Sequence, residues 1–416
     1  MSYRYIIAFS VIIGFCVILD IYTWYGLKKT VSRNVFRFFK WFIPSTTILF
    51  FLGFIINIYR GGHGIHNASY FLNIITGFSF GVFLAKLLIA APFLLEDLFR
   101  FPYYLVKKIA SKKGEKVSVP GRRKFIRNLS LAMASIPLAG TIYAITRGKY
   151  NYEVYHHSLA FPDLPSSFDG LKIVQFSDFH AGSFDDTVAV ENGLKLINEQ
   201  KPDVIVFTGD IVNNRASECE PYIDFLDKLE APLGKFAILG NHDYGKYMPF
   251  ENEHLEKENW QELIRIFDRT GFQLLRNEHV KIQQKGQELA IVGVENWGNP
   301  PFPQYGDINQ AIKGLDRDTF SILLSHDPDH WDHQIRLHPM HFPLTLSGHT
   351  HGAQFGVDIP GWRWSPVKYR YRRWLGLYKE DHQHLFVSKG FGFLGFPGRI
   401  GMSPEIIVHE LKILSG

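Results

Sequence analysis

Gly240-Asn241-His242-Asp243 directly follows an apolar run, residues 236–239, and this order predicts a short buried strand that ends in polar side chains. Gly240 permits a tight turn off that strand. Asn241 and His242 then project together from the strand end. An amide oxygen beside an imidazole is unfavourable in a hydrophobic core, but the pair could bind a metal ion and supply an acid. The tetrapeptide alone is weak evidence, so the other ligands have to come from elsewhere in the chain.

Four more apolar runs end in the same way, each in side chains that bind metals. In α/β sheets ligands bind beyond the carboxyl ends of strands, so the five strand ends should meet at one crevice. Asp178 and His180 are spaced by two, as are His349 and His351, which predicts that each pair shares one face of an extended strand end. The runs and their ligands are residues 173–177 before Asp178 and His180, 204–208 before Asp210, 322–325 before His326, and 344–347 before His349 and His351.

The order of these motifs, D-x-H, G-D, G-N-H-D, H and G-H-x-H, resembles the calcineurin-like metallophosphoesterase superfamily. The match covers residues 171–352 and is complete at every signature position. Tyr378, the run 388–392 and Pro404-Glu405-Ile406 also look like the membrane-anchored bacterial branch of that superfamily. The resemblance implies an α/β fold in which two facing β-sheets with helices outside form an α-β-β-α sandwich.

The resemblance also implies a site for two divalent metal ions bridged by the Asp210 carboxylate. Two such ions supply a nucleophilic hydroxide and neutralise phosphate charge. His242 is then expected to protonate the leaving oxygen or stabilise its charge, with Asp243 orienting it. A mixture of imidazole, carboxylate and amide without thiolate favours Mn, Fe or Zn. The implied ligands are Asp178, His180, Asp210 and His351 for one metal, and Asp210, Asn241, His326 and His349 for the other.

Charge is distributed unevenly along the 416 residues. Residues 1–149 contain 20 Lys and Arg against 4 Asp and Glu, whereas residues 150–416 contain 25 against 36. The acidic second part argues against nucleic acid as a partner. The basic excess of the first part lies mostly between apolar segments, which is typical of membrane proteins. Cys16 and Cys219 are not expected to pair, so they do not indicate a redox compartment.

The sequence predicts a membrane domain at 1–149 followed by a metallophosphoesterase domain at 150–416. Four apolar segments, near 5–25, 41–59, 68–95 and 129–145, approach the roughly 20 residues that span a bilayer. The fourth is short and is the one most open to a buried-helix interpretation. Basic residues crowd the loops at 28–40 and 100–127, and positive loops stay in the cytoplasm, so the catalytic domain is expected outside it. Arg122-Arg123 also resembles a twin-arginine export signal, although an ordinary basic flank is preferred.

Several other residues have a structural interpretation beside a functional one. For Asp20, Asn73 and Lys86 in the apolar segments, we expect snorkelling or placement at a helix end. For His330, His333, His338 and His341, and for His156 and His157, we expect surface positions. The aromatic and basic run 362–374 fits either a membrane–water interface or an exposed strand pair with aromatic cross-strand contacts. A further hypothesis is that Arg399 contacts the substrate phosphate.

These patterns predict a membrane-anchored, dinuclear metal-dependent phosphoesterase. Its expected substrate is a phosphodiester or phosphoanhydride, lipid-linked or at the membrane surface, and membrane lipids are its expected partners. One alternative is a UDP-diacylglucosamine pyrophosphatase of lipid A synthesis, which requires the catalytic face in the cytoplasm. The other is an inactive binding or scaffold homologue, and the intact ligand set argues against it.

Overall fold

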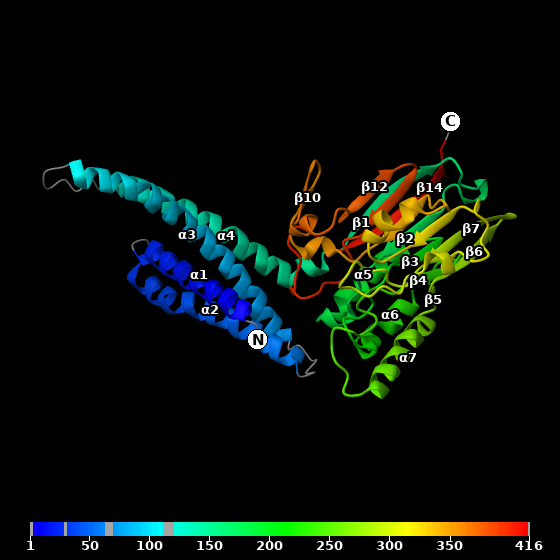
Figure 1. Ribbon diagram of the computed structural model, residues 1–416, viewed down its shortest axis with the longest axis horizontal. Coiled ribbons are helices and arrows are strands. Elements are labelled where there is room, and N and C mark those ends of the chain that lie inside the picture. Colours follow the sequence, from blue (N-terminus) through cyan, green and yellow to red (C-terminus); the bar gives the residue numbers. More distant parts are fainter. Residues whose placement is uncertain (1–2, 29–30, 63–69, 111–119, 415–416) are drawn as a thin grey trace. The chain divides into compact units, whose positions relative to one another are not determined.

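The computed structural model describes residues 3–28, 31–62, 70–110 and 120–414 (Figure 1). The chain divides into two compact units, Met1–Ile145 and Thr146–Gly416. The start of the third apolar segment at Ala68 lies outside the described residues, as do the loop residues Lys29, Lys112, Lys113 and Lys116.

The first unit consists of helices that are long and apolar enough to cross a membrane. Their apolar windows are residues 11–28, 33–53, 74–99 and 128–146, the last of which is 19 residues long. Each window overlaps one of the four predicted segments. The helices are α1 (Tyr3–Lys28), α2 (Arg33–Gly62), α3 (Tyr70–Ala110) and α4 (Pro120–Thr146).

Two charged side chains of the first unit pair inside the helix bundle, so the snorkelling interpretation of Asp20 and Lys86 is wrong. Lys86 Nζ lies 2.7 Å from Asp20 Oδ1 and donates to Thr47 Oγ1 at 2.7 Å and the Ile43 carbonyl at 2.6 Å. Thr47 in turn donates to Asp20 Oδ2 at 2.8 Å. Pairing satisfies both charges locally, which is the usual arrangement for ionisable groups within membrane helices. The side chain of Asn73 lies outside the described part of the chain.

The second unit contains two six-stranded mixed sheets with helices outside them, which confirms the predicted α/β sandwich (Figure 1). The first sheet has the order β1-β14-β2-β3-β4-β5, and β2, β3 and β4 are parallel. Its strands are β1 (Glu153–Phe161), β2 (Lys172–Phe176), β3 (Val204–Phe207), β4 (Lys235–Ala237), β5 (Gln273–Leu274) and β14 (Glu405–Ile413).

The second sheet has the order β12-β13-β9-β8-β7-β6, in which β7, β8, β9 and β13 are parallel. A separate two-stranded hairpin pairs β10 (Val357–Ile359) with β11 (Trp362–Trp364). The strands of the second sheet are β6 (Glu278–Gln284), β7 (Gln287–Gly293), β8 (Ser321–Leu324), β9 (Leu344–Ser347), β12 (Gly376–Glu380) and β13 (Gln383–Val387).

Alternation along the strands explains why both faces of each sheet are covered. Val204 and Val206 of β3 point into the core between the sheets, which also contains Ile322 of β8. Ile205 and Phe207 point to the opposite face and pack in the core that contains residues of α5 and α7. A strand that is buried on both faces has a continuous apolar sequence, and the sequence of β3 is of this kind. The helices are α5 (Thr187–Glu199), α6 (Ile223–Asp227), α7 (Glu253–Arg269), α8 (Ile308–Ala311) and α9 (Asp329–His333).

One run with helical spacing of apolar residues does not form a single α-helix. Residues 217–230 have helical spacing of apolar side chains, but Ala216–Tyr222 is a 3-10 helix and only Ile223–Asp227 is α-helical. Pro221 lies at this change, and proline lacks the amide that an α-helical turn requires.

The arrangement of strands places the five polar ends together. β2, β3 and β4 run parallel in the first sheet, and β8 and β9 run parallel in the second. The loops that leave their carboxyl ends carry the side chains described next.

Candidate metal centre

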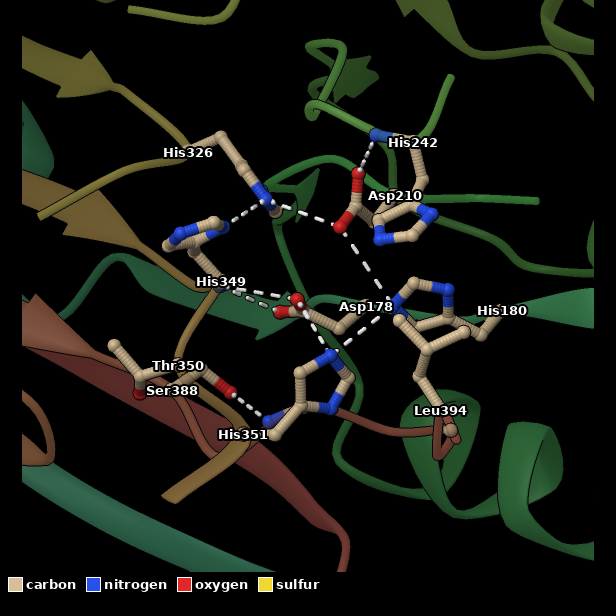
Figure 2. A network of polar contacts seen from close by, with 12 residues as sticks. Asp178, His180, Asp210, His242, His326, His349, Thr350, His351, Ser388 and Leu394 are labelled. Atoms are coloured by element: carbon tan, nitrogen blue, oxygen red, sulfur yellow. Dashed lines mark hydrogen bonds and ion pairs between the residues drawn. The ribbon is translucent and has the colours of Figure 1, made fainter. Parts of the chain in front are cut away.

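Six ionisable side chains from the predicted strand ends meet in two groups (Figure 2). In each group the ligand atoms lie within 4.8 Å of one another. The two groups come from both sheets, so the site depends on the packing of one sheet against the other. The groups are Asp178, His180 and His351, and Asp210, His326 and His349.

The Asp210 carboxylate lies between the two groups. Its Oδ2 atom is 3.2 Å from His326 Nε2 and 3.6 Å from His180 Nε2, and these imidazoles belong to different groups. Its other oxygen, Oδ1, accepts a hydrogen bond from the His242 amide at 2.8 Å. The Asp210 carboxylate therefore contacts an imidazole of each group.

Asn241 provides an independent test of whether this cluster suits a metal. Its Nδ2 atom donates to Tyr247 Oη at 2.9 Å, which fixes the orientation of the amide. Its Oδ1 atom is buried and has no hydrogen-bond partner among the described residues. A buried orphan oxygen is costly, and a metal ion would remove that cost. The donor set of imidazole, carboxylate and amide therefore fits divalent metals.

The backbone brings the ligands together in a way that the sequence analysis did not anticipate. The prediction that each D-x-H or H-x-H pair shares the face of an extended strand is wrong, because these residues lie beyond the strand ends in left-handed conformations. Such conformations are uncommon outside glycine and concentrate at functional sites. The φ angles are 53° for Asp178, 50° for His180, 62° for Asp210, 73° for His349 and 51° for His351.

Position 240 requires a glycine because atoms of Asp210 approach it closely. It is not in the left-handed region, so the predicted turn is not the reason for a glycine here. A Cβ atom at this position would lie 2.2 Å from Asp210 Oδ1 and 2.7 Å from the Asp210 amide nitrogen. Any side chain at Gly240 would therefore displace the shared carboxylate.

Hydrogen bonds fix which nitrogen of each imidazole faces the centre. His326 Nδ1 donates to the Thr208 carbonyl at 2.7 Å, which leaves Nε2 facing Asp210. His349 is turned the other way: its Nδ1 is 3.3 Å from His326 Nε2, and its Nε2 lies 2.7 Å from Tyr371 Oη. Partners of this kind orient metal-binding imidazoles.

Asn213 contacts two of the predicted site histidines. Its Oδ1 atom lies 3.0 Å from His180 Nδ1, and its carbonyl oxygen accepts from His242 Nδ1 at 2.8 Å. Because a carbonyl can only accept, the Nδ1 atom of His242 carries a proton and Nε2 is the free nitrogen. His242 is half-buried whereas the ligands of the first group are fully buried, so its ring has access to an incoming molecule.

Electrostatics keep most of these groups in the forms that bind metals. Burial lowers the pKa of His180 and that of His349 to about 3, so both imidazoles are neutral. Burial disfavours charge on Asp210 as well, but the neighbouring imidazoles, His326 first, hold the pKa of that carboxyl well below its usual range. Burial also opposes protonation of His326, yet the Asp210 carboxylate raises the pKa of His326 to about 10. A proton on His326 thus provides the positive charge that a metal ion would provide.

The prediction that Asp243 orients His242 is wrong. The Asp243 carboxylate accepts hydrogen bonds from the Gly240 amide at 2.8 Å, from the Asp210 amide at 2.9 Å and from the Ile211 amide at 2.8 Å. Asp243 therefore ties the loop after β3 to the loop after β4. The carbonyl that orients His242 belongs to Asn213, a residue that no motif singled out.

Two further expectations are corrected. Arg399 is buried, and its guanidinium donates to the carbonyl oxygens of Lys389, Gly392 and Met402, so it is not positioned to bind a substrate phosphate. Instead its Nη2 lies 3.5 Å from His351 Nδ1.

His330 is fully buried and not at the surface. It contacts Ser325 Oγ at 2.8 Å and Gln334 Oε1 at 3.1 Å, so it is a satisfied core histidine. His333 and His341 are exposed as expected.

Comparison with known proteins agrees with this geometry. Residues 3–149 match the family described as probable calcineurin-like phosphoesterase, transmembrane domain, and residues 171–353 match the calcineurin-like phosphoesterase family. The chain is 34% identical over 301 residues to the uncharacterized metallophosphoesterase YkuE of Bacillus subtilis, which covers 70% of this chain and 97% of that relative.

Two other relatives have more specific names. Identity is 28% over 277 residues to the UDP-2,3-diacylglucosamine pyrophosphatase LpxG of Chlamydia trachomatis, covering 55% of this chain and 81% of LpxG. It is 28% over 294 residues to the phosphodiesterase YaeI of Escherichia coli, covering 70% and 98%. The chain belongs to the calcineurin-like metallophosphoesterase family, in which it is an integral membrane member with an N-terminal transmembrane domain.

Proposed function

We propose that the two groups of side chains hold two divalent metal ions and that the enzyme hydrolyses a phosphodiester or phosphoanhydride. The observation that supports this proposal is the position of the Asp210 carboxylate, whose Oδ2 atom lies between imidazoles of both groups. The proposed ligands are Asp178, His180, Asp210 and His351 for one ion, and Asp210, Asn241, His326 and His349 for the other.

When bound, the two ions would supply a hydroxide nucleophile and neutralise phosphate charge. The nitrogen and oxygen donors suit Mn, Fe or Zn. Neither free cysteine belongs to the two groups, so thiolate plays no part. The chain contributes the fixed orientation of each donor, through the Thr208 carbonyl behind His326 and the Asn213 amide behind His180.

His242 is the proposed proton donor. Its Nδ1 proton is held by the Asn213 carbonyl, so only Nε2 can reach the leaving oxygen. The ring centroids of His242 and His180 are 5.0 Å apart, so the proposed acid would lie beside a proposed ligand. A positioned acid of this kind typically contributes about 10²–10⁴-fold in rate.

The proposed substrate is lipid-linked or lies at the surface of the membrane, outside the cytoplasm. Four apolar helices anchor the chain, and its basic residues crowd the loops at 28–40 and 100–127, which should stay in the cytoplasm. With an even number of crossings, the N-terminus and the catalytic unit then share the opposite side.

A second candidate is UDP-diacylglucosamine pyrophosphatase activity. The similarity to LpxG favours it, and this activity would require a cytoplasmic catalytic unit. An inactive scaffold is disfavoured because every proposed donor atom is present. These alternatives differ in substrate and in side of the membrane, so two experiments separate them.

The first experiment is a substrate panel on the purified full-length protein, with Mn, Zn, Fe and Mg tested in parallel. The panel contains a soluble phosphodiester, a glycerophospholipid and a UDP-linked diacyl sugar, and His242→Ala serves as the matched control. If the unmodified protein hydrolyses the phospholipid and His242→Ala does not, the result supports the proposal. Hydrolysis of the UDP-linked lipid alone would support the second candidate, and no hydrolysis with any metal would support the scaffold.

The second experiment determines the side of the membrane. A fusion of alkaline phosphatase at Gly416 is expected to be active, because that reporter works only outside the cytoplasm. The fourth apolar window, residues 128–146, decides the result: if it lies along the surface, the catalytic unit stays inside. Activity of a cytoplasmic reporter alone at Gly416 would contradict the proposal and favour the UDP-linked lipid.

A further inference from the structure

A short hairpin follows the loop that carries His349 and His351. It comprises β10, β11 and the 3-10 helix Pro366–Tyr369, and we call residues 357–370 the aromatic–basic hairpin. The sequence analysis left two interpretations of this run open. The structure provides the contacts and exposures needed to choose between them.

One face of the hairpin is fixed to the catalytic unit. Asp358 pairs with Arg363 across the two strands, at 3.0 Å. Asp358 also accepts from Lys389 Nζ at 3.0 Å, and Lys389 is a buried cation that pairs with Glu405 at 3.2 Å. This chain of charges attaches the hairpin to β14 of the first sheet.

The other face is apolar and exposed. Side chains alternate along a strand, so Ile359 and Trp362, which are cross-strand partners, point away from the Asp358 side. Their exposed fractions are 51% and 59%, and that of Tyr369 is 77%. A cross-strand pair formed only for stability would bury its contact surface, whereas most of this surface faces outward.

Cations flank these exposed apolar side chains. Lys368 and Arg370 are exposed, and within the described part of the chain neither forms an ion pair with a carboxylate. Arg373 differs, because it is buried and bonds to Asp332 and Glu380. Arg363 and Arg372 also pair with carboxylates. Among the described basic residues of the run, the charge that faces solvent is therefore that of Lys368, whereas the Arg370 guanidinium lies over the Tyr371 ring.

The hairpin is connected directly to the metal-binding loop. Ser365 Oγ donates to the Gly352 carbonyl at 2.7 Å, and Gly352 follows His351. Immediately after the hairpin, Tyr371 Oη contacts His349 Nε2 at 2.7 Å. These two hydrogen bonds join the hairpin and the residue that follows it to the loop that carries His349 and His351.

We propose that the aromatic–basic hairpin docks into the headgroup region of an anionic lipid bilayer and presents lipid phosphates to the metal centre. Exposed tryptophan and tyrosine suit the membrane–water interface, and exposed lysine and arginine attract anionic headgroups. The chain also carries four helices that are long and apolar enough to cross a membrane, so the catalytic unit is tethered to a bilayer. The choice of lipid phosphate as ligand rests on the proposed function, whereas docking itself does not require catalysis.

The test places an environment-sensitive fluorophore on the full-length protein in vesicles. Trp362→Cys is labelled at the hairpin, and Arg317→Cys is labelled as a matched control. Arg317 is exposed in the loop that leads into β8, at the amino-terminal edge of a sheet whose metal-binding loops leave the opposite edge. The native cysteines are buried, so labelling is selective. The vesicles contain phosphatidylcholine, with or without phosphatidylglycerol, and a nitroxide lipid that quenches on contact.

Quenching at position 362 should clearly exceed that at 317 in anionic vesicles, and should fall in neutral vesicles and at high salt. In a Trp362→Cys background, Lys368→Gln should lower the docking equilibrium by roughly fivefold, since a cation near the surface contributes about that much. Equal quenching at 362 and 317 would overturn the proposal. A label at position 362 that is shielded from water but not quenched by the nitroxide lipid would also overturn the proposal, because it would indicate a second protein copy on this face.

Hydrolysis is measured separately on Lys368→Gln with Trp362 retained. Its turnover of a soluble phosphodiester should match that of the unmodified protein, while turnover of vesicle lipid falls. Quenching at 362 without lipid hydrolysis by the unmodified protein would support docking and contradict the proposed lipid substrate. Equal loss on soluble and vesicle substrates would overturn the role of the hairpin in presenting lipid.

Discussion

Tyr371→Phe tests how the proposed second metal is positioned. The phenol oxygen lies 2.7 Å from His349 Nε2, and both side chains are largely buried. For His349 Nδ1 to offer its lone pair to a metal, the ring proton must be on Nε2, where Tyr371 Oη accepts it. Phenylalanine keeps the ring and the packing but removes this acceptor, so Tyr371 is expected to act as a positioning residue.

The expected loss of metal affinity follows from the His349 N–H that Tyr371→Phe leaves without its acceptor. Asp327 Oδ2 is 3.8 Å from His349 Nε2, which is too far for a hydrogen bond. An unsatisfied buried donor costs about 1–3 kcal/mol. Loss of a partner behind a metal ligand typically costs about 10–100-fold in metal affinity, which is about 1.4–2.7 kcal/mol. A shift of Asp327 toward His349 would place the result at the lower end.

The assay is metal content against free metal concentration, combined with kinetics at limiting and saturating metal. Tyr371→Phe should release one of two ions about 10–100-fold more readily, and saturating metal should restore most of kcat. Tyr369→Phe is the matched control, because it deletes the same hydroxyl from an exposed ring two residues away. Unchanged metal affinity in Tyr371→Phe, or an equal loss in Tyr369→Phe, would refute the reasoning.

Three further outcomes are expected. Asp210→Asn should lose metal and activity together, because its carboxylate contacts both groups; elemental analysis that finds two ions per chain would contradict the bridging assignment. His242→Ala should keep its metals while kcat falls about 10²–10⁴-fold, with a smaller loss on substrates whose leaving groups are strongly acidic. Lys86→Met should destabilise the helix bundle by about 3–5 kcal/mol, because it leaves the Asp20 charge buried without a partner. The double variant Lys86→Met with Asp20→Asn should recover much of this stability in a thermal unfolding assay. Equal unfolding temperatures for the single and double variants would show that the pair is not coupled.

The left-handed ligands show where sequence reasoning reached its limit within the site itself. Regular spacing correctly predicted that Asp178 and His180 lie in one group, but for the wrong geometric reason. Their φ angles of 53° and 50° are imposed by the packed loops around them, including the tie from the Asp178 carboxylate to the His349 amide at 3.0 Å. A local pattern cannot show a conformation that distant contacts impose.

The sequence by itself determined the sandwich, the four apolar helices and the identities of the clustered side chains. It could do so because each ligand follows a buried apolar run, and parallel strands bring their carboxyl ends to one edge. That information is local, and the order of the motifs along the chain preserves it.

Only the tertiary structure decided the partners that hold those ligands. Tyr371 reaches His349, Asp243 ties two loops and Lys86 pairs with Asp20, and each of these residues looked ordinary or misleading in the sequence. Their partners come from other segments, so the contact exists only once helices or sheets have packed. Burial then makes each hydrogen bond or ion pair obligatory. A polar group that is buried without a partner has lost its hydrogen bonds to water, and this loss destabilises the folded state.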